Sequence, residues 1–433
     1  MAKAASNGHR RVAIVNGLRT PFVKAATVFS DLTALDLGRL VVSELVQRSE
    51  LDPNELDSVV FGQVIPGMTA ASIAREVVLT SGLPRKIEAY TVARACATSV
   101  QAMVNAGMAI ALGQSDVAIA GGTESMSDPP IFTSRPLAHA LAESSRARTL
   151  PARLKPFQRL APKDLLPVPP AIAEYTTGLS MGESAEKMAK ENGISRKEQD
   201  EIALASHQNA ARAWKAGHFD AEVMHVPVPP KYAKVADTDN IVRGDSSLEA
   251  LTALKPVFDR KYGTVTAGNA SPLTDGAAAL LLMSEEKAKA LGYEPLGFLR
   301  AHAFAATDPA DQLLQGPAYA APIVLDRAGM TLKDIDLVEM HEAFAAQVAS
   351  NLQALASRSF AEKLGRKAPV GEVDRARLNV NGGSIALGHP FAATGARIVH
   401  QALRELKRRN LGTALVTVCA QGGLGAAVVL ERA

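Results

Sequence analysis

Two stretches of the chain repeat one another at a constant offset. Residues 48–60, RSELDPNELDSVV, lie over residues 327–339, RAGMTLKDIDLVE. Each stretch is typical of the end of a helix, a short acidic linker and the start of a strand. An internal repeat of this kind indicates a duplicated α/β unit, in which neither copy buries its sheet face alone. A chain of 433 residues is long enough for two or three domains.

The apolar segments around the repeat alternate between strands and helices. Strands are predicted over 12–15, 58–62, 116–122, 276–283, 414–419 and 426–431, with a turn over 17–21. Helices are predicted over 35–49, 71–81, 97–112, 344–355 and 392–408. This order is typical of a parallel or mixed sheet that is covered by helices.

Between residues 123 and 270 the character of the chain changes, and we interpret this part as an insertion. Helices are predicted over 181–192 and 196–216. The run Arg135–Lys163 holds seven basic residues against one acid, Glu143. Such a run most often forms a solvated face, and a surface for an anionic ligand or a partner is the alternative. The net charge of +3 is too small to indicate nucleic-acid binding, which we do not expect.

Cysteine usage and hydropathy indicate the compartment. The chain has two cysteines far apart in sequence, which argues against a disulfide framework and fits a reducing cytosol. The first residues have no apolar export segment, and no apolar run approaches the roughly 20 residues of a membrane span. We therefore expect a soluble cytoplasmic protein.

Cys96 and His341 both lie where a predicted strand gives way to a helix. The first-turn N–H groups and the dipole of the helix that follows Cys96 predict a stabilised thiolate, the reactive form of cysteine. The commoner role of a free cysteine is that of a small buried apolar side chain. His341 begins the segment HEAFA, in which Ala345 stands where a zinc protease has its second histidine. No metal site is predicted.

His389 and Cys419 belong to two glycine-rich segments. Pro390 disfavours helix at His389, so that this imidazole is expected on a loop just before a helix. Cys419 lies at the carboxyl end of a buried strand, before a glycine turn. Strand ends and the loops after them carry the sites of layered α/β proteins. Each segment also has a purely structural explanation: a histidine can bond the backbone, a cysteine can pack in the core, and glycines can form ordinary turns. The coincidence of all four segments at strand ends favours one shared pocket.

The chain resembles the thiolase family over nearly its whole length. The matching segments are GLRTPF at 17–22, CATS at 96–99, AGGTESM at 120–126, TAGNASPLTDGAAA at 266–279, HEAF at 341–344, GHP at 388–390 and Cys419 with its glycines. The resemblance implies the thiolase fold, an α/β fold of two duplicated five-layered αβαβα halves with an inserted loop domain. It implies an N-terminal half over 1–125 with a return segment over 272–293, a CoA-binding insertion over 126–271 and a C-terminal half over 294–433.

The resemblance also implies the chemistry, which is thiolytic cleavage of a 3-ketoacyl-CoA with coenzyme A as co-substrate and no permanently bound cofactor. Cys96 would be the nucleophile, His389 its base and Cys419 the second acid and base. His341, through a water, and His389 would meet the enolate oxygen, and the backbone N–H groups of Cys96 and Gln421 would meet the other oxygen. The residues expected to contact the pantetheine arm or to line its tunnel are Ser271, Met181 and Phe344.

Within the family, His341 stands where most members have Asn, as in the thiolase subunit of the fatty-acid β-oxidation complexes. That branch implies a homodimer in a heterotetramer with an α subunit that carries hydratase and dehydrogenase activities. The run Arg135–Lys163 would then meet CoA phosphates, an anionic membrane surface or the partner. A biosynthetic acetoacetyl-CoA thiolase is the alternative, although Ser180 stands where that group has His. Thr98 and Gln421 are further departures from the common pattern.

Overall fold

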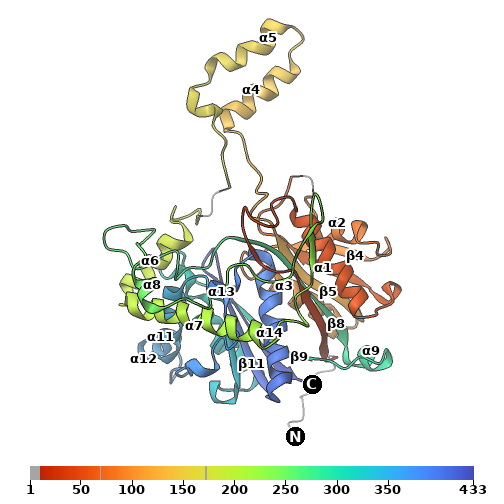
Figure 1. The fold of residues 1–433 in the computed structure, drawn as a ribbon, viewed down its shortest axis with the longest axis vertical. Coiled ribbons are helices and arrows are strands. Elements are labelled where there is room, and N and C mark those ends of the chain that lie inside the picture. The colour runs from red at the N-terminus through yellow and green to blue at the C-terminus, as the bar shows by residue number, and fades with distance from the viewer. Residues whose placement is uncertain (1–9, 69, 171–172) are drawn as a thin grey trace. The chain divides into compact units, whose positions relative to one another are not determined.

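The computed structural model describes residues 10–68, 70–170 and 173–433, and by packing these residues form two compact units (Figure 1). The main unit comprises the described residues of Met1–Val64, Ser72–Asp128 and Ala173–Ala433. The second unit comprises those of Ile65–Ala71 and Pro129–Ile172. The predicted insertion over 126–271 is longer than the second unit, and its boundaries stay a prediction.

A ten-stranded sheet forms the centre of the main unit, in the order β10-β11-β12-β9-β1-β8-β5-β3-β4, with β2 beside β8. Its strands are β1 (Val12–Arg19), β2 (Val23–Lys24), β3 (Ser58–Gly62), β4 (Glu88–Val92), β5 (Val117–Glu124), β8 (Thr274–Ser284), β9 (Gly297–Ala306), β10 (Leu337–Met340), β11 (Thr413–Ala420) and β12 (Leu424–Arg432). The turn predicted from Gly17 is wrong, because β1 continues through it. A register shift between Ile14 and Asn16 lets Gly17 pair with Leu280 of β8.

The two halves of the sheet repeat one arrangement. β5 lies parallel to β3 and antiparallel to β8, and β11 lies parallel to β10 and antiparallel to β12. A short antiparallel pairing of β1 with β9 joins the halves. The helix α1 (Ala34–Arg48), the one-turn helix Pro53–Glu55 and β3 correspond to α10 (Gly316–Ala328), Leu332–Asp334 and β10 at the offset of the sequence repeat. The predicted duplication is thereby confirmed.

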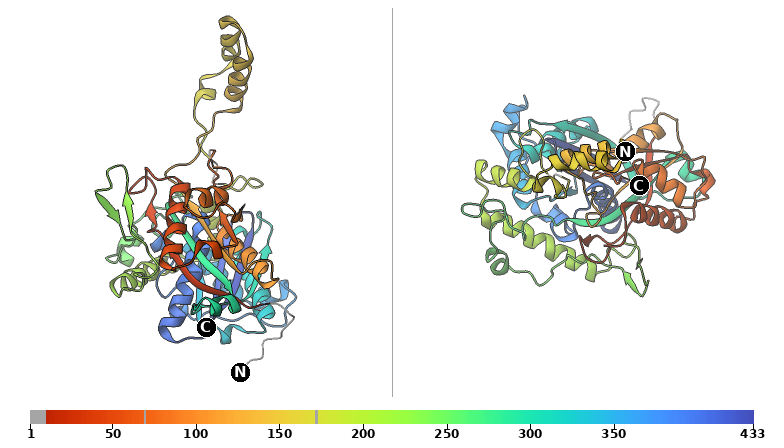
Figure 2. Two further views of the ribbon diagram at one scale, coloured as in Figure 1. Left: turned by 90° about the vertical axis from the view of Figure 1, so that its right-hand side faces the viewer. Right: turned by 90° about the horizontal axis from the view of Figure 1, so that it is seen from above.

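Helices cover both faces of each half (Figures 1 and 2). The helices α3 (Thr98–Ala111) and α14 (Thr394–Arg409) pack against each other and share one apolar core with strands of both halves. The helices α1 and α2 (Ile73–Thr80) lie on the first half, and α10 lies on the second. The order is therefore outer helices, one half of the sheet, the α3–α14 pair, the other half of the sheet and outer helices, five layers in all.

The segment between the halves adds helices and a small hairpin to the main unit. These elements are β6 (Val226–Val228), β7 (Lys234–Ala236), α6 (Met181–Glu191), α7 (Arg196–Lys215), α8 (Leu248–Thr252) and α9 (Glu285–Ala290). The C-terminal half also contains α11 (Ala345–Ala356), α12 (Arg358–Lys363) and α13 (Ser384–Leu387). Ser180 caps α6, since its hydroxyl accepts a hydrogen bond from the backbone N–H of Glu183 at 3.2 Å.

A buried arginine ties the hairpin segment to β1. The guanidinium of Arg19 donates two hydrogen bonds to the carboxylate of Asp239, at 2.7 and 2.9 Å, and one to Glu222 at 3.1 Å. All three side chains are buried. Buried charges require paired partners of this kind, so the segment is held to the sheet by a network rather than by apolar contact alone.

The second unit contains the run Arg135–Lys163. It forms α4 (Arg135–Arg146), α5 (Leu150–Leu154) and the 3-10 turns Lys155–Arg159 and Pro162–Leu165. Large apolar side chains are exposed throughout it, namely Ile131, Phe132, Leu141, Leu150, Leu154, Leu165, Leu166 and Val168. Among the described helices of the whole chain, none combines the length and the apolar character needed to cross a membrane.

Candidate active site

Cys96 lies in a tight turn between β4 and α3. Ala95 has a positive φ of 43°, and the Thr98 hydroxyl closes the turn. This hydroxyl accepts from the Arg94 N–H at 2.8 Å and donates to the Ala95 carbonyl at 2.7 Å. Gly62 packs so closely on Thr98 that a Cβ there would lie 1.9 Å from its methyl group. The turn that carries Cys96 therefore requires glycine at position 62 of the neighbouring strand β3.

The surroundings of the partly buried Cys96 thiol favour its neutral form. Burial raises its pKa to about 12, although the backbone N–H groups of Gln421 and of Cys96 itself act in the opposite direction, and the carboxylate of Glu124 raises it further. This shift opposes the stabilised thiolate expected from the helix start. The free-energy cost of desolvating the thiolate exceeds the stabilisation that the two N–H groups give it.

Two histidines face the Cys96 sulfur. One ligand atom each of Cys96, His341 and His389 lies within 4.8 Å of the others. The two rings are 4.1 Å apart between centroids, and both are buried. Among the described residues, neither Nε2 atom has a hydrogen-bond partner. Burial lowers the pKa of His389 to about 3 and that of His341 well below its ordinary 6.5, so both imidazoles are neutral.

His389 is fixed on a loop before α14, as predicted. Gly388 has a φ of 96°, and a Cβ there would lie 2.8 Å from the Thr274 methyl group. On the other side, the Nδ1 of His389 lies 2.6 Å from the Thr394 hydroxyl in the first turn of α14. These contacts engage Nδ1 and leave Nε2 as the ring nitrogen available to the cluster with Cys96.

His341 directly follows β10, as predicted. Its backbone N–H donates to the Thr417 carbonyl at 2.9 Å, so that β11 fixes the residue. The side-chain amide of Asn379 bonds both the N–H and the carbonyl of Met340, at 2.8 and 2.9 Å. The Nδ1 of His341 lies 2.8 Å from the Ser384 hydroxyl. Strand, loop and α13 together orient this imidazole.

Cys419 lies at the carboxyl end of β11 and is buried. Burial, and then the nearness of Cys96, raises the pKa of its thiol well above the ordinary value, and the backbone N–H of Ala343 acts in the opposite direction. The Gln421 side chain donates to the Ala173 carbonyl at 2.8 Å. Its backbone N–H thus serves the Cys96 sulfur while the side chain is engaged elsewhere, which explains how glutamine is tolerated here.

The predicted substrate-contacting residues gather beside the start of α11. Phe344 packs edge-to-face on Phe258 with centroids 6.1 Å apart, and Met181 packs against the same apolar cluster. The backbone N–H of Ser271 donates to the Ala343 carbonyl at 2.9 Å. That cluster also contains Cys419. The structure therefore brings Phe344 and Met181 into the apolar cluster of Cys419 and bonds Ser271 beside them, and their contact with a pantetheine stays a prediction.

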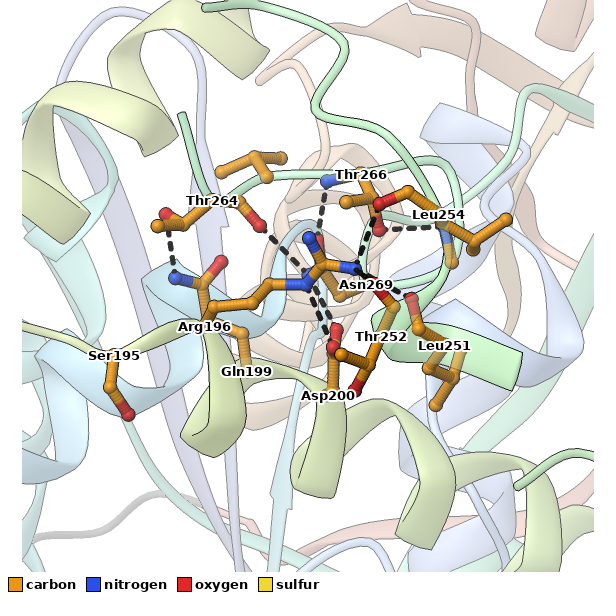
Figure 3. A network of polar contacts seen from close by, with 12 residues as sticks. Ser195, Arg196, Gln199, Asp200, Leu251, Thr252, Leu254, Thr264, Thr266 and Asn269 are labelled. Atoms are coloured by element: carbon orange, nitrogen blue, oxygen red, sulfur yellow. Dashed lines mark hydrogen bonds and ion pairs between the residues drawn. The ribbon is translucent and has the colours of Figure 1, made fainter. Parts of the chain in front are cut away.

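A buried polar network holds the segment that leads to Ser271 (Figure 3). The Asn269 amide donates to Asp200 at 2.9 Å and to the Thr264 carbonyl at 3.1 Å, and its oxygen accepts from the Thr266 N–H at 2.8 Å. Arg196 pairs with the other Asp200 oxygen at 2.7 Å. The Asn269 carbonyl accepts from the backbone N–H at the start of α11, at 2.9 Å. Helix α7 thereby fixes the loop next to the site.

Three polar residues of the site were not assigned a role from the sequence: Ser384, Thr394 and Arg397. Thr394 follows His389 by five residues at a helix start, which is a usable signal for a local contact. Ser384 lies 43 residues after His341, and Arg397 reaches Ser384 from the next helix. No sequence pattern connects these positions, because only the fold brings them together.

Family models match almost all of the chain. A model for the N-terminal domain of thiolase matches residues 12–286, and a model for the C-terminal domain matches residues 293–432. Among curated relatives, "3-ketoacyl-CoA thiolase" of Shewanella pealeana is 55% identical over 422 residues, 97% of each chain. The protein of the same name from Shewanella sp. (strain W3-18-1) is 54% identical over the same share.

Solved structures agree with these matches. A Bacillus anthracis acetyl-CoA acetyltransferase superposes with a TM-score of 0.85 at 34% identity, covering 99% of this chain and 100% of its own. Human mitochondrial 3-ketoacyl-CoA thiolase in complex with CoA superposes with a TM-score of 0.81 at 32% identity, covering 98% of both chains.

Proposed function

The chain belongs to the thiolase family of acyltransferases, and on that premise we propose that it cleaves 3-ketoacyl-CoA with free CoA, giving acetyl-CoA and an acyl-CoA shortened by two carbons. This would be the last step of fatty-acid β-oxidation. The observation that carries the proposal is the cluster of Cys96, His341 and His389 with Cys419 beside it. The two cysteines come from opposite halves of the duplicated fold.

The first half-reaction would form an acyl-enzyme. The Cys96 sulfur attacks the 3-keto carbon while the neutral His389 accepts the thiol proton at Nε2. The bond between carbons 2 and 3 breaks, and its electron pair leaves as the enolate of acetyl-CoA. Cys419 donates a proton to carbon 2, which completes acetyl-CoA and leaves the acyl group on Cys96.

The second half-reaction would return the enzyme to its starting state. The Cys419 thiolate takes the proton of an incoming CoA, and the CoA sulfur attacks the acyl carbon on Cys96. The released Cys96 sulfur recovers the proton held by His389. A second thiol suits this task, because an acid–base group works best when its pKa lies near that of its partner.

Two oxygens carry negative charge during these steps. The keto oxygen would meet the backbone N–H groups of Cys96 and Gln421, which already converge on the Cys96 sulfur. The enolate oxygen would meet the side of the pocket where the two histidine Nε2 atoms lie without partners among the described residues. Removing one such donor typically costs about a hundred- to a thousandfold in rate.

Trapping the acyl group tests the proposal. A 3-ketoacyl-CoA supplied without free CoA should add one acyl mass to Cys96, located by peptide mass spectrometry, and release one acetyl-CoA. Adding CoA should then discharge the label as the shortened acyl-CoA. The Cys96→Ser variant is the matched control and should retain no acyl group. An acyl label on Cys419, or none on Cys96, would exclude the mechanism.

A biosynthetic acetoacetyl-CoA thiolase is the second candidate, supported by the similarity to the acetyl-CoA acetyltransferase structure. The two candidates differ in the length of the acyl chain that they prefer. Ser180, which stands where the biosynthetic enzymes have His, here caps α6. Thiolysis rates over a series from acetoacetyl-CoA to a long-chain 3-ketoacyl-CoA separate them. A catalytic efficiency that peaks at the four-carbon substrate would favour the biosynthetic enzyme.

For the assembly, we propose a cytoplasmic homodimer that binds an α subunit with hydratase and dehydrogenase activities. The exposed apolar side chains and basic residues of the second unit support an interaction surface there. Light scattering of the purified chain, alone and with a candidate α subunit, gives the mass of each assembly. Sedimentation with anionic vesicles tests a membrane contact instead. We also propose that residues 126–271 supply most contacts to CoA.

A further inference from the structure

The Ser384 hydroxyl lies between a fixed cation and the ring of His341. One guanidinium nitrogen of Arg397 lies 2.8 Å from the Ser384 oxygen, and the Nδ1 of His341 lies 2.8 Å from the same oxygen. All three side chains are buried. Each member comes from a different element, since Arg397 belongs to α14, Ser384 to α13 and His341 follows β10.

Proton counting assigns the direction of both hydrogen bonds. Arginine has no acceptor atom, so Arg397 donates and the Ser384 oxygen accepts. The Ser384 hydroxyl proton then needs an acceptor, and His341 Nδ1 is the other atom that contacts it. If Nδ1 donated instead, the hydroxyl proton would be left buried without this partner, which is costly. The chain therefore runs from Arg397 through Ser384 to Nδ1.

We propose that Arg397 and Ser384 are positioning residues that keep the ring proton of His341 on Nε2, where it donates toward the enolate oxygen through the expected water. This rests on the proposed function, since it concerns the enolate step. With Nδ1 engaged by Ser384, Nε2 is the ring nitrogen left for the cluster with Cys96 and His389, and it is buried and without a partner among the described residues. A cation at the start of a hydrogen-bond chain polarises every donor along it, which favours negative charge at the end.

His389 shows the opposite arrangement. Its Nδ1 contacts the Thr394 hydroxyl. Among the described residues, no arginine donates a hydrogen bond to that hydroxyl. Nδ1 is therefore free to donate to Thr394, which leaves the lone pair on Nε2 for the Cys96 proton. In both adjacent rings Nδ1 is engaged and Nε2 is left without a partner among the described residues, but Nε2 of His341 is a donor and Nε2 of His389 is a base. The proton on His341 Nε2 also removes one of the three lone pairs that a metal would need.

The two half-reactions separate this role from a structural one. Solvent deuterium exchange into the methyl group of acetyl-CoA reports the enolate step. Exchange of isotopically labelled CoA into acyl-CoA reports acyl transfer through Cys96, which forms no enolate. Ser384→Ala should slow deuterium exchange about tenfold to a hundredfold while acyl exchange stays within about twofold of wild type.

A double-mutant cycle supplies the matched control. In His341→Asn the donor is an amide N–H₂ group, which needs no particular ring tautomer. Adding Ser384→Ala to this variant should therefore slow deuterium exchange by less than about twofold. Ser384→Thr, which keeps the hydroxyl, should restore most of the rate. Ser384→Cys keeps the volume with a weak donor and replaces alanine if that variant does not fold.

Two results would overturn the inference. One is an equal loss in both exchange reactions on Ser384→Ala. The other is the same loss of deuterium exchange from Ser384→Ala in the His341→Asn background as in the wild-type background. A wild-type protein that carries out neither exchange would instead refute the proposed function, so the two failures are distinguishable.

Discussion

Replacing His389 by alanine should convert a pH-independent nucleophile into a pH-dependent one. With a pKa of about 12, the Cys96 thiol is ionised at neutral pH in only about one molecule in 10⁵. That population is about a thousandfold below that of a thiol with the ordinary pKa of 9, a difference of about 4 kcal/mol. Cys96 must therefore lose its proton as it attacks, and His389 is the neighbouring acceptor.

The pH profile follows from the pKa of His389, which burial lowers to about 3. The wild-type imidazole is neutral from about pH 5 to about pH 9, so the rate of Cys96 alkylation by iodoacetamide should be nearly flat there. In His389→Ala the rate at neutral pH should fall by about a hundred- to ten-thousandfold. It should also rise about tenfold per pH unit, because hydroxide must then generate the thiolate.

Alkylation can be assigned to one sulfur because the chain has two cysteines. A Cys419→Ser background leaves Cys96 as the single thiol to label. His341→Ala in that background is the control and should keep the flat alkylation profile. Turnover, measured with Cys419 intact, should fall strongly in His341→Ala and less in His341→Asn. The reasoning is refuted if His389→Ala is alkylated with a flat profile. Thiolate absorbance in the resting wild-type protein near neutral pH would refute it as well.

Three further variants test the packing around the site. Burial raises the pKa of Glu339 from 4.5 to about 8. As the pH rises, the unfolded chain loses this proton before the folded chain does, so the free energy of unfolding should fall by about 1.4 kcal/mol per pH unit between those two values. Glu339→Gln should remove that fall, measured by urea titrations at about pH 5 and about pH 8. Gly62→Ala should cost about 1–3 kcal/mol through its clash with Thr98, and adding Thr98→Ser should recover part of the loss in thermal melts. Arg19→Met should cost about 3–5 kcal/mol because it leaves two buried carboxylates unpaired, and a loss below about 1 kcal/mol would contradict the buried ion-pair network.

The fold was predictable from the sequence because its main signals are local or repeated. The repeat at 48–60 and 327–339 fixes helix, one-turn linker and strand in both halves, and the structure reproduces that order. Gly113 ends α3 with a φ of 75°, as its position after an apolar helix indicates. The failure at Gly17 has a physical cause. Glycine favours a turn by its local preference, but pairing with β8 and the register shift before Gly17 keep this residue extended.

The residues of the site were predictable only where each one had its own local signature. Cys96, His341, His389 and Cys419 lie at strand ends or on glycine-rich loops, and the fold gathers them. Ser384 and Arg397 have no such signature, since an ordinary serine and an ordinary helix arginine acquire meaning only through the atoms they meet. Contacts between residues far apart in the chain depend on the packing of α13 and α14, which no periodicity reveals.

The protonation states were the least predictable feature, because two large effects of opposite sign act on the same atoms. The sequence places Cys96 before a helix, and the helix N-terminus alone favours a thiolate by at most about 2 kcal/mol. Desolvation of Cys96, which packs partly buried against a core shared by both halves, opposes it by more, and full burial removes the charge from both histidines. A pocket that is neutral at rest must then create its charges during the reaction. The donors and the base must be in place beforehand, which is why the proton positions on His341 and His389 matter more than their basicity.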